Sequence, residues 1–426
     1  MRSRTLIVCL TSSLAVARVL LSTGCGSDSS GPGVQATEGG TVSFDAPTDA
    51  PAAFPLADTS FGVGGVARFT HAADWTDSRF STSLLGPDDS IVVVSTTGKS
   101  EHTELARLTA NGQVERAFAP SSTGVPTRGA FDVYSLTLDG DGKLVLVGAN
   151  GDQSQAQRLL ADGTKDAAFN AYVPIGDSFD SASLGGAVTE SSGTVLACMS
   201  SRTTSARVIR FGSNGAAQQV NDAGTTATAC PNLLLSDGSF LALVRGTVLA
   251  TGGQTSKVVR LTRDLVLDAN FGPPASDPTT FSSIQGLAAL ETRAFYAVGT
   301  RGVLGVTVAR YTPAGVLDPS FAAAGIADLS KTLIGNTSVA LQSDGKIVVS
   351  GSTSKEQRGV ARVVRLLPSG ALDASFGDAG VVDYDGGSDS DAPKVYVQKS
   401  GRIVALGTVR DASGVQDVVA FAFRSP

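Results

Sequence analysis

An internal repeat of about fifty residues constrains the fold more than any other feature of this sequence. Six arginines, each set in a short apolar segment, step along the chain by 51, 52, 50, 50 and 55 residues: Arg107, Arg158, Arg210, Arg260, Arg310 and Arg365. Five of them are followed eleven residues later by a phenylalanine: Phe118, Phe169, Phe271, Phe321 and Phe376. In the Arg210 copy, Asn221 holds that place. Matches at one spacing indicate one structural unit repeated along the chain.

A polar turn and an apolar run precede each arginine. The clearest turns are Asp141-Gly142-Lys143 and Asp344-Gly345-Lys346, and looser copies begin at Asp88, Ser192, Asp237, Glu291 and Ser400. Asp-Gly between apolar stretches predicts a β-hairpin, because its tight turn needs positive φ angles. Several of the apolar runs do not alternate with polar residues, which indicates that both faces of each sheet are covered.

Each repeat thus offers about four strands, and the glycine-rich composition, with 49 glycines, suits tight turns between them. Four antiparallel strands per repeat of this length predict an all-β fold, a β-propeller of four-stranded antiparallel blades. The seventh turn has no Asp-x-x-Phe tail after it, but residues 56–62, which include Phe61, match that tail. We therefore expect a seven-bladed propeller over residues 54–426, closed by an N-terminal strand that completes the last blade and removes exposed edges.

The first 25 residues are typical of an export signal and lie outside the folded domain. Arg2 and Arg4 precede a largely apolar stretch that ends at Ser22-Thr23-Gly24-Cys25. A small residue before a cysteine resembles the lipobox of bacterial lipoproteins, although Ser22 stands where leucine is usual. The alternative is an ordinary secretory peptide with a chance cysteine. Residues 26–53 are predicted to be a flexible tether. We expect lipidation at Cys25, with the protein held in the cell envelope, at the outer membrane or cell surface.

The best-preserved copy carries a family resemblance. The segment from Val339 through Asp344-Gly345-Lys346, with Arg365 and the tail Leu372-Asp373-Ala374-Ser375-Phe376-Gly377, resembles the bacterial delta-60 repeat, a predicted β-propeller family frequent in myxobacteria. The resemblance covers the chain from about Leu56 onward. It implies a fold but no particular activity, since fold does not determine function.

An acidic residue also recurs, three positions before each phenylalanine. It is Asp58, Glu115, Asp166, Asp268, Asp318 or Asp373. A carboxylate there can accept backbone hydrogen bonds in a turn and pair with the arginine of the adjoining strand. Because an architecture needs such a residue in every blade and catalysis does not, we predict a structural role for these repeated residues.

Signals for chemistry are sparse. The only two histidines are His71 and His102, and no cysteine or carboxylate cluster at metal-ligand spacing surrounds them. One acidic segment could hold Ca²⁺ but is better explained as a solvated connection: Asp383, Asp385, Asp389 and Asp391. We therefore expect no catalytic residue, metal or cofactor. The net charge of −6 argues against a nucleic-acid partner.

Two cysteines, Cys198 and Cys230, fall in neighbouring repeats. Export to an oxidising compartment permits a disulfide between them, whereas two buried free thiols are the alternative.

Three functions are compatible with these features. The leading hypothesis is a lipid-anchored, monomeric binding or scaffold module whose loops contact an unknown protein or glycan. The alternatives are a propeller enzyme, such as a metal-dependent hydrolase, and a purely structural envelope protein.

Overall fold

The computed structural model describes residues 54–69, 78–97, 102–115, 118, 132–150, 153–169, 186–190, 192–199, 207–219, 229–247, 254–272, 281–301, 305–385, 389–410 and 414–425. All of them lie in the unit Thr41–Pro426. Their regular elements are all β-strands, and none of them forms a helix with the length and hydropathy of a membrane span.

The strands form antiparallel sheets of three or four strands each, numbered here in chain order. The first sheet contains β2 (Ser78–Leu85), β3 (Ile91–Thr97) and β4 (His102–Leu108). The second contains β5 (Asp132–Leu138), β6 (Leu144–Asn150) and β7 (Gln153–Leu159). The third contains β8 (Gly186–Thr189), β9 (Val195–Met199), β10 (Arg207–Phe211) and β11 (Ala217–Gln219).

The remaining sheets continue the order along the chain. The fourth contains β12 (Ala229–Leu234), β13 (Phe240–Thr247) and β14 (Gln254–Leu261). The fifth contains β15 (Ser283–Ala289), β16 (Phe295–Thr300), β17 (Val306–Tyr311) and β18 (Ile326–Asp328). The sixth contains β19 (Ile334–Leu341), β20 (Ile347–Lys355), β21 (Arg358–Leu366) and β22 (Val381–Tyr384). The seventh contains β23 (Lys394–Val397), β24 (Ile403–Arg410), β25 (Gln416–Phe423) and β1 (Val66–Phe69).

The predicted hairpin turns join the first two strands of each sheet. In the sixth sheet, Gly345 has φ +82° and its N–H donates to the carbonyl of Gln342 at 2.9 Å. A side chain is strained in this left-handed conformation, which explains why glycine recurs at this place. The turn sets the register of β19 on β20, with Leu341 opposite Ile347.

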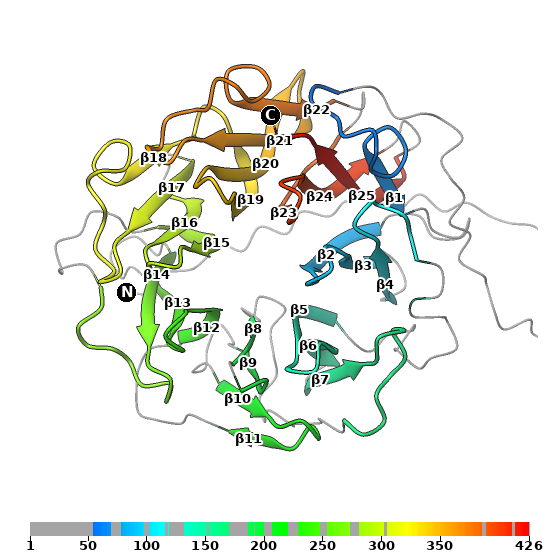
Figure 1. The fold of residues 1–426 in the computed structure, drawn as a ribbon, viewed down its shortest axis with the longest axis vertical. Coiled ribbons are helices and arrows are strands. Elements are labelled where there is room, and N and C mark those ends of the chain that lie inside the picture. The colour runs from blue at the N-terminus through cyan, green and yellow to red at the C-terminus, as the bar shows by residue number, and fades with distance from the viewer. Residues whose placement is uncertain are drawn as a thin grey trace, which may run out of the picture. The chain divides into compact units, whose positions relative to one another are not determined.

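Neighbouring sheets pack face to face in chain order (Figure 1). The first strands of successive sheets contact one another from β2 through β5, β8, β12, β15 and β19 to β23. The hydrophobic clusters lie between sheets. One of them joins Ile91 and Val93 of the first sheet to Leu406 and Val418 of the seventh. Burial on both faces explains the apolar runs that do not alternate.

The two ends of the described chain meet in the seventh sheet. β1 pairs antiparallel with β25, with Val66 opposite Phe421 and Phe69 opposite Val418. In the sixth and seventh sheets the fourth strand begins after the tail phenylalanine, since Phe376 and Phe61 lie in the turns that precede β22 and β1. In the third sheet, β11 instead ends before the tail position 221. The first, second and fourth sheets have three strands among the described residues, rather than the predicted four, and the segments that follow their tails lie outside those residues.

Candidate functional site

The repeated arginines form ion pairs within their own sheets. In the sixth sheet, Arg365 is fully buried, and its Nε donates to Oδ2 of Asp373 at 2.8 Å. The guanidinium carbon of Arg365 lies 4.5 Å from the centroid of the Phe376 ring. The same three-residue contact recurs with small variations in other sheets: Arg107 with Glu115 and Phe118, Arg158 with Asp166 and Phe169, and Arg260 with Asp268 and Phe271. The contact ties the third strand of a sheet to the turn that follows it.

The seventh sheet makes this contact with an arginine from a turn rather than from its third strand. Phe423 pairs with Ile403 as Leu366 pairs with Ile347, so Ala422 stands at the arginine position of β25. Arg402, in the turn just before β24, instead donates to Oδ2 of Asp58 at 2.7 Å and lies 5.6 Å from the Phe61 ring. The sequence pattern missed Arg402, because it compared only positions on the third strand.

Most of these arginines also reach the next sheet. Their Nη1 atoms donate to a backbone carbonyl in its turn: Ala161 from Arg107, Ser213 from Arg158, Pro313 from Arg260 and Ala110 from Arg402. Arg365 donates to the hydroxyl of Ser425 instead. A guanidinium suits this double task because its planar fork carries several N–H groups.

The third sheet departs from this pattern. Arg210 donates two hydrogen bonds to Glu190, from Nη2 to Oε1 at 2.8 Å and from Nε to Oε2 at 3.1 Å. Its Nη1 donates to no described residue. The Nη1 group of Arg310 also donates to no described residue. The Arg310 copy nevertheless keeps its tail phenylalanine, Phe321, which is fully buried. The Arg210 copy has Asn221 at that position. Asn221 itself lies outside the described residues.

The fourth sheet has a matching departure. The turn after its third strand carries Leu265 at φ +62°, where five other sheets carry glycine at positive φ: Gly112, Gly163, Gly215, Gly315 and Gly370. A Cβ atom at Gly315 would lie 2.8 Å from the ring of Phe271 in the preceding sheet, so a tail phenylalanine excludes a side chain there. Leu265 is only 2% exposed and joins the cluster that contains Phe240. The loss of a phenylalanine in one sheet and the gain of a leucine in the next are therefore complementary.

A pocket of about 230 Å³ remains between the third and fourth sheets, next to this altered junction. The third sheet contributes Glu190, Ser192 and Arg210 to its lining, and the fourth contributes Leu234, Phe240, Arg263 and Asp264 among others. It therefore combines two carboxylates and two guanidinium groups with an apolar floor. A second cavity, beside Phe295 and Tyr311, measures only about 40 Å³.

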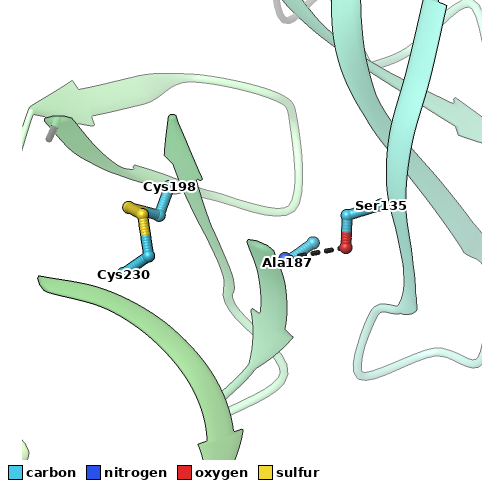
Figure 2. The surroundings of a disulfide bond; sticks show 4 residues. All are labelled: Ser135, Ala187, Cys198 and Cys230. Carbon is cyan, nitrogen blue, oxygen red and sulfur yellow. Dashed lines mark hydrogen bonds between the residues drawn. A yellow bond between two sulfur atoms is a disulfide. The ribbon is translucent and has the colours of Figure 1, made fainter. Parts of the chain in front are cut away.

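A disulfide crosses the same junction. Cys198 on β9 and Cys230 on β12 are bonded, with Cα atoms 5.3 Å apart (Figure 2). On the other side of the third sheet, the hydroxyl of Ser135 on β5 accepts a hydrogen bond from the N–H of Ala187 on β8 at 2.9 Å (Figure 2). The third sheet is thus held by a covalent link to the fourth sheet and by hydrogen bonds to the second.

The acidic segment suspected of holding Ca²⁺ is occupied by contacts within the protein. Asp383 pairs with Arg362, Asp385 with Arg358, Asp389 accepts from the N–H of Gly359, and Asp391 from the N–H of Thr408. Burial raises the pKa of Asp391, although hydrogen bonds from the N–H and the hydroxyl of Thr408 act in the opposite direction. No three metal-ligating side chains gather anywhere in the described part of the chain.

The first strands of the sheets carry further polar contacts. On β23, the Nζ of Lys394 lies 5.2 Å from the ring centroid of Tyr396, and burial lowers the pKa of Lys394. The Tyr396 hydroxyl shares a hydrogen bond of 3.0 Å with Ser83 on β2. Burial raises the pKa of Tyr396. This contact joins the seventh sheet to the first.

Several predicted site residues cannot be placed. Cys25 and His71 lie outside the described residues, and of His102 only its position on β4 is described. Among the described residues, the sequence patterns missed Glu190 and Leu265. Two sequence signals mark this junction: the leucine at a turn position where other repeats have glycine, and the missing phenylalanine.

Comparison with known proteins agrees with this architecture. Residues 342–376 match a family described as "Domain of unknown function (DUF5122) beta-propeller". The BP39L lectin from Burkholderia pseudomallei is similar in structure with a TM-score of 0.51 and 11% sequence identity, over 82% of this chain and 96% of the lectin. Virginiamycin B lyase from Staphylococcus aureus gives a TM-score of 0.47 at 11% identity, over 82% of this chain and 95% of the lyase. No curated protein matches the chain significantly in sequence.

The fold is that of a β-propeller. Structural similarity at such low sequence identity shows the fold alone and carries no information on ligands. The candidate functional site of this propeller is the pocket between the third and fourth sheets, because its residues depart there from the repeat that serves the architecture.

Proposed function

We propose that this protein is a lipid-anchored β-propeller of the cell envelope that binds a small ligand in the pocket between its third and fourth sheets. The observation that carries this proposal is the altered junction. Most other copies of the repeat use their arginine and phenylalanine in contacts within and between sheets, whereas this junction contains a pocket lined by polar groups. In ligand sites, a small number of placed polar and charged groups fix the orientation of the ligand.

The proposed architecture is a ring of seven four-stranded blades closed by β1. Its supports are the pairing of β1 with β25, the contacts of β2 with β24 and β25, and the hydrophobic cluster shared by the first and seventh sheets. Closure would remove two exposed sheet edges. Deleting residues 56–66 should then lower the melting temperature strongly, and an unchanged melting curve would contradict a closed ring.

The proposed anchor is a lipid on Cys25. Its support is the sequence pattern typical of export signals that ends at this cysteine, together with the polar segment of residues 26–53 that follows. A diacyl anchor holds a protein far more firmly than a single chain does. Cys25→Ser should move the protein from the membrane fraction to the soluble fraction, and retention in the membrane fraction would argue against lipidation.

A blocked pocket tests the binding function. Ser192 is exposed at the pocket rim in the turn before β9, so Ser192→Trp should fill the entrance without changing any charge. A panel of amino acids, monosaccharides and small carboxylates is titrated into the protein and its Ser192→Trp variant, with melting temperature and NMR shifts as readouts. At least one class should bind the native protein and fail to bind the variant. If no compound binds, or if the variant binds equally, this pocket is not the ligand site.

A further inference from the structure

The geometry points to a zwitterionic ligand: we propose that the pocket takes a free α-amino acid, with its carboxylate on Arg210 and its ammonium group on Asp264. This inference rests on the proposed binding function and adds the chemical class of the ligand. It uses the repeated arginine whose contacts differ from those of most other copies, and a carboxylate to which no described residue donates a hydrogen bond.

Arg210 supplies the carboxylate end. Glu190 binds the Nε and Nη2 side of the guanidinium through two hydrogen bonds, at 3.1 and 2.8 Å, and so fixes its plane. The Nη1 group, which in most other sheets donates to a carbonyl of the next sheet, has no acceptor among the described residues. The Arg210 side chain is 28% exposed, so a ligand can reach this group. Arginine N–H groups bind carboxylates through strong, directional hydrogen bonds.

Asp264 supplies the other end. It belongs to the turn after the third strand of the fourth sheet, whereas Arg210 belongs to the third sheet, and both residues line the pocket. Its side chain is exposed, and no described residue donates a hydrogen bond to it. An unpaired carboxylate attracts an ammonium group or a hydroxyl.

The balance of charge favours a ligand with both signs. The lining holds two carboxylates, Glu190 and Asp264, and two guanidinium groups, Arg210 and Arg263, so its formal charge is zero. A simple anion would meet the two carboxylates, and a simple cation would meet the two arginines. A zwitterion places each of its charges beside the opposite one and keeps the site neutral.

The dimensions limit the ligand to one small molecule. The volume of about 230 Å³ lies below the usual range for drug-sized ligands, which begins at about 300 Å³. Leu234 and Phe240 form an apolar floor that suits a short aliphatic side chain. A single amino acid fits these limits better than a peptide does.

The test uses the full-length protein and isothermal titration with glycine, alanine, valine and leucine, each beside its N-acetyl and its amide derivative. We expect at least one free amino acid to bind, and both derivatives of it to bind at least tenfold more weakly. Arg210→Gln and Asp264→Asn should each weaken binding at least tenfold. Asp162→Asn is the matched control, because Asp162 holds the same turn position in the second sheet, and it should leave binding unchanged.

Two outcomes would overturn the proposal in different ways. A monosaccharide or a simple carboxylate that binds the native protein but not Ser192→Trp, while no amino acid binds, would reject the zwitterion and keep the binding function. Amino-acid binding that survives both Arg210→Gln and Asp264→Asn would reject the assigned groups. If no compound of any class binds, the proposed function and this inference fail together.

Discussion

Two junctions of this propeller solve the same packing problem in different ways. Between the fifth and sixth sheets, Phe321 is fully buried against the turn that carries Gly370, and the N–H of Ala322 donates to the carbonyl of Ser369 at 2.7 Å. Between the third and fourth sheets, Asn221 and Leu265 hold the places of that phenylalanine and that glycine. A pocket and a disulfide are found there instead.

The difference shows that the phenylalanine and the glycine are one feature divided between two repeats. A Cβ atom at Gly370 would lie 2.9 Å from the ring of Phe321 and 2.6 Å from the Cβ atom of Ala322, so the tail of the preceding sheet leaves no space for a side chain there. Once the ring is lost, a buried side chain at the glycine position recovers apolar contact, even at the strain of a positive φ angle. The junction that departs from the repeat also contains the pocket of about 230 Å³.

The largest expected difference between the two regions concerns their arginines. Arg365→Ala should lower the free energy of unfolding by about 3 kcal/mol, because it removes the fully buried partner of Asp373 and leaves this carboxylate with Lys346 alone, at 3.7 Å. Arg210→Ala should cost about 1 kcal/mol, since the Arg210–Glu190 pair is partly exposed. Urea unfolding of both variants measures the difference. Equal losses would mean that the two arginines are equivalent.

The disulfide should contribute the next largest effect. Replacing both Cys198 and Cys230 by alanine should lower the free energy of unfolding by about 3 kcal/mol, because the bond restrains the unfolded chain across 32 residues. Unfolding under non-reducing conditions measures this loss. A reducing agent should lower the stability of the native protein to that of the double variant and leave the variant unchanged. A reducing agent without effect on the native protein would contradict the bond.

Leu265 provides a sharper test of the complementary substitution. Leu265→Ala should cost about 2 kcal/mol, at the low end for a buried leucine because the neighbouring pocket lets the site relax. Leu265→Gly should cost about 1 kcal/mol less than alanine, since glycine relieves the strain at φ +62°. The reverse order in thermal unfolding would show that the backbone at this turn is not strained.

Acid should have the smallest effect on stability, and we expect it at the junction between the fourth and fifth sheets. The hydrogen bond from Ser239 and the charge of Arg293 in the fifth sheet lower the pKa of Asp237 to about 2. Because this value lies below the unfolded value of about 3.9, the contribution is complete above about pH 4 and is lost as the pH falls toward 2. Both side chains of the pair are more than a third exposed, so solvent screening limits the effect to less than about 1 kcal/mol.

A comparison variant isolates this contribution. Asp237→Asn should lose stability at pH 7 and lose less than the native protein between pH 4 and pH 2. Parallel denaturation curves of the two proteins across that range would show that Asp237 does not contribute to acid sensitivity.

The spacing of the repeat predicted much of this molecule. Hairpin turns at Asp-Gly pairs, antiparallel sheets and the pairing of β1 with β25 all follow from local turn chemistry and from counting turns against tails. Ala422 stands at the arginine position of β25, and Arg402 makes the contact with Asp58 in its place. This replacement could not be predicted, because only the strand register brings Arg402 beside Asp58.

The sequence by itself determined the architecture, since turns, apolar runs and repeat spacing are local or periodic properties of the chain. It also marked Arg210 as an exception through the missing phenylalanine. Only the tertiary structure showed where the exception has its effect. Arg210 and Asp264 are 54 positions apart, and the stacking of two sheets places them around one pocket. A site made by packing between repeats has no signature within any single repeat, because its walls belong to different copies.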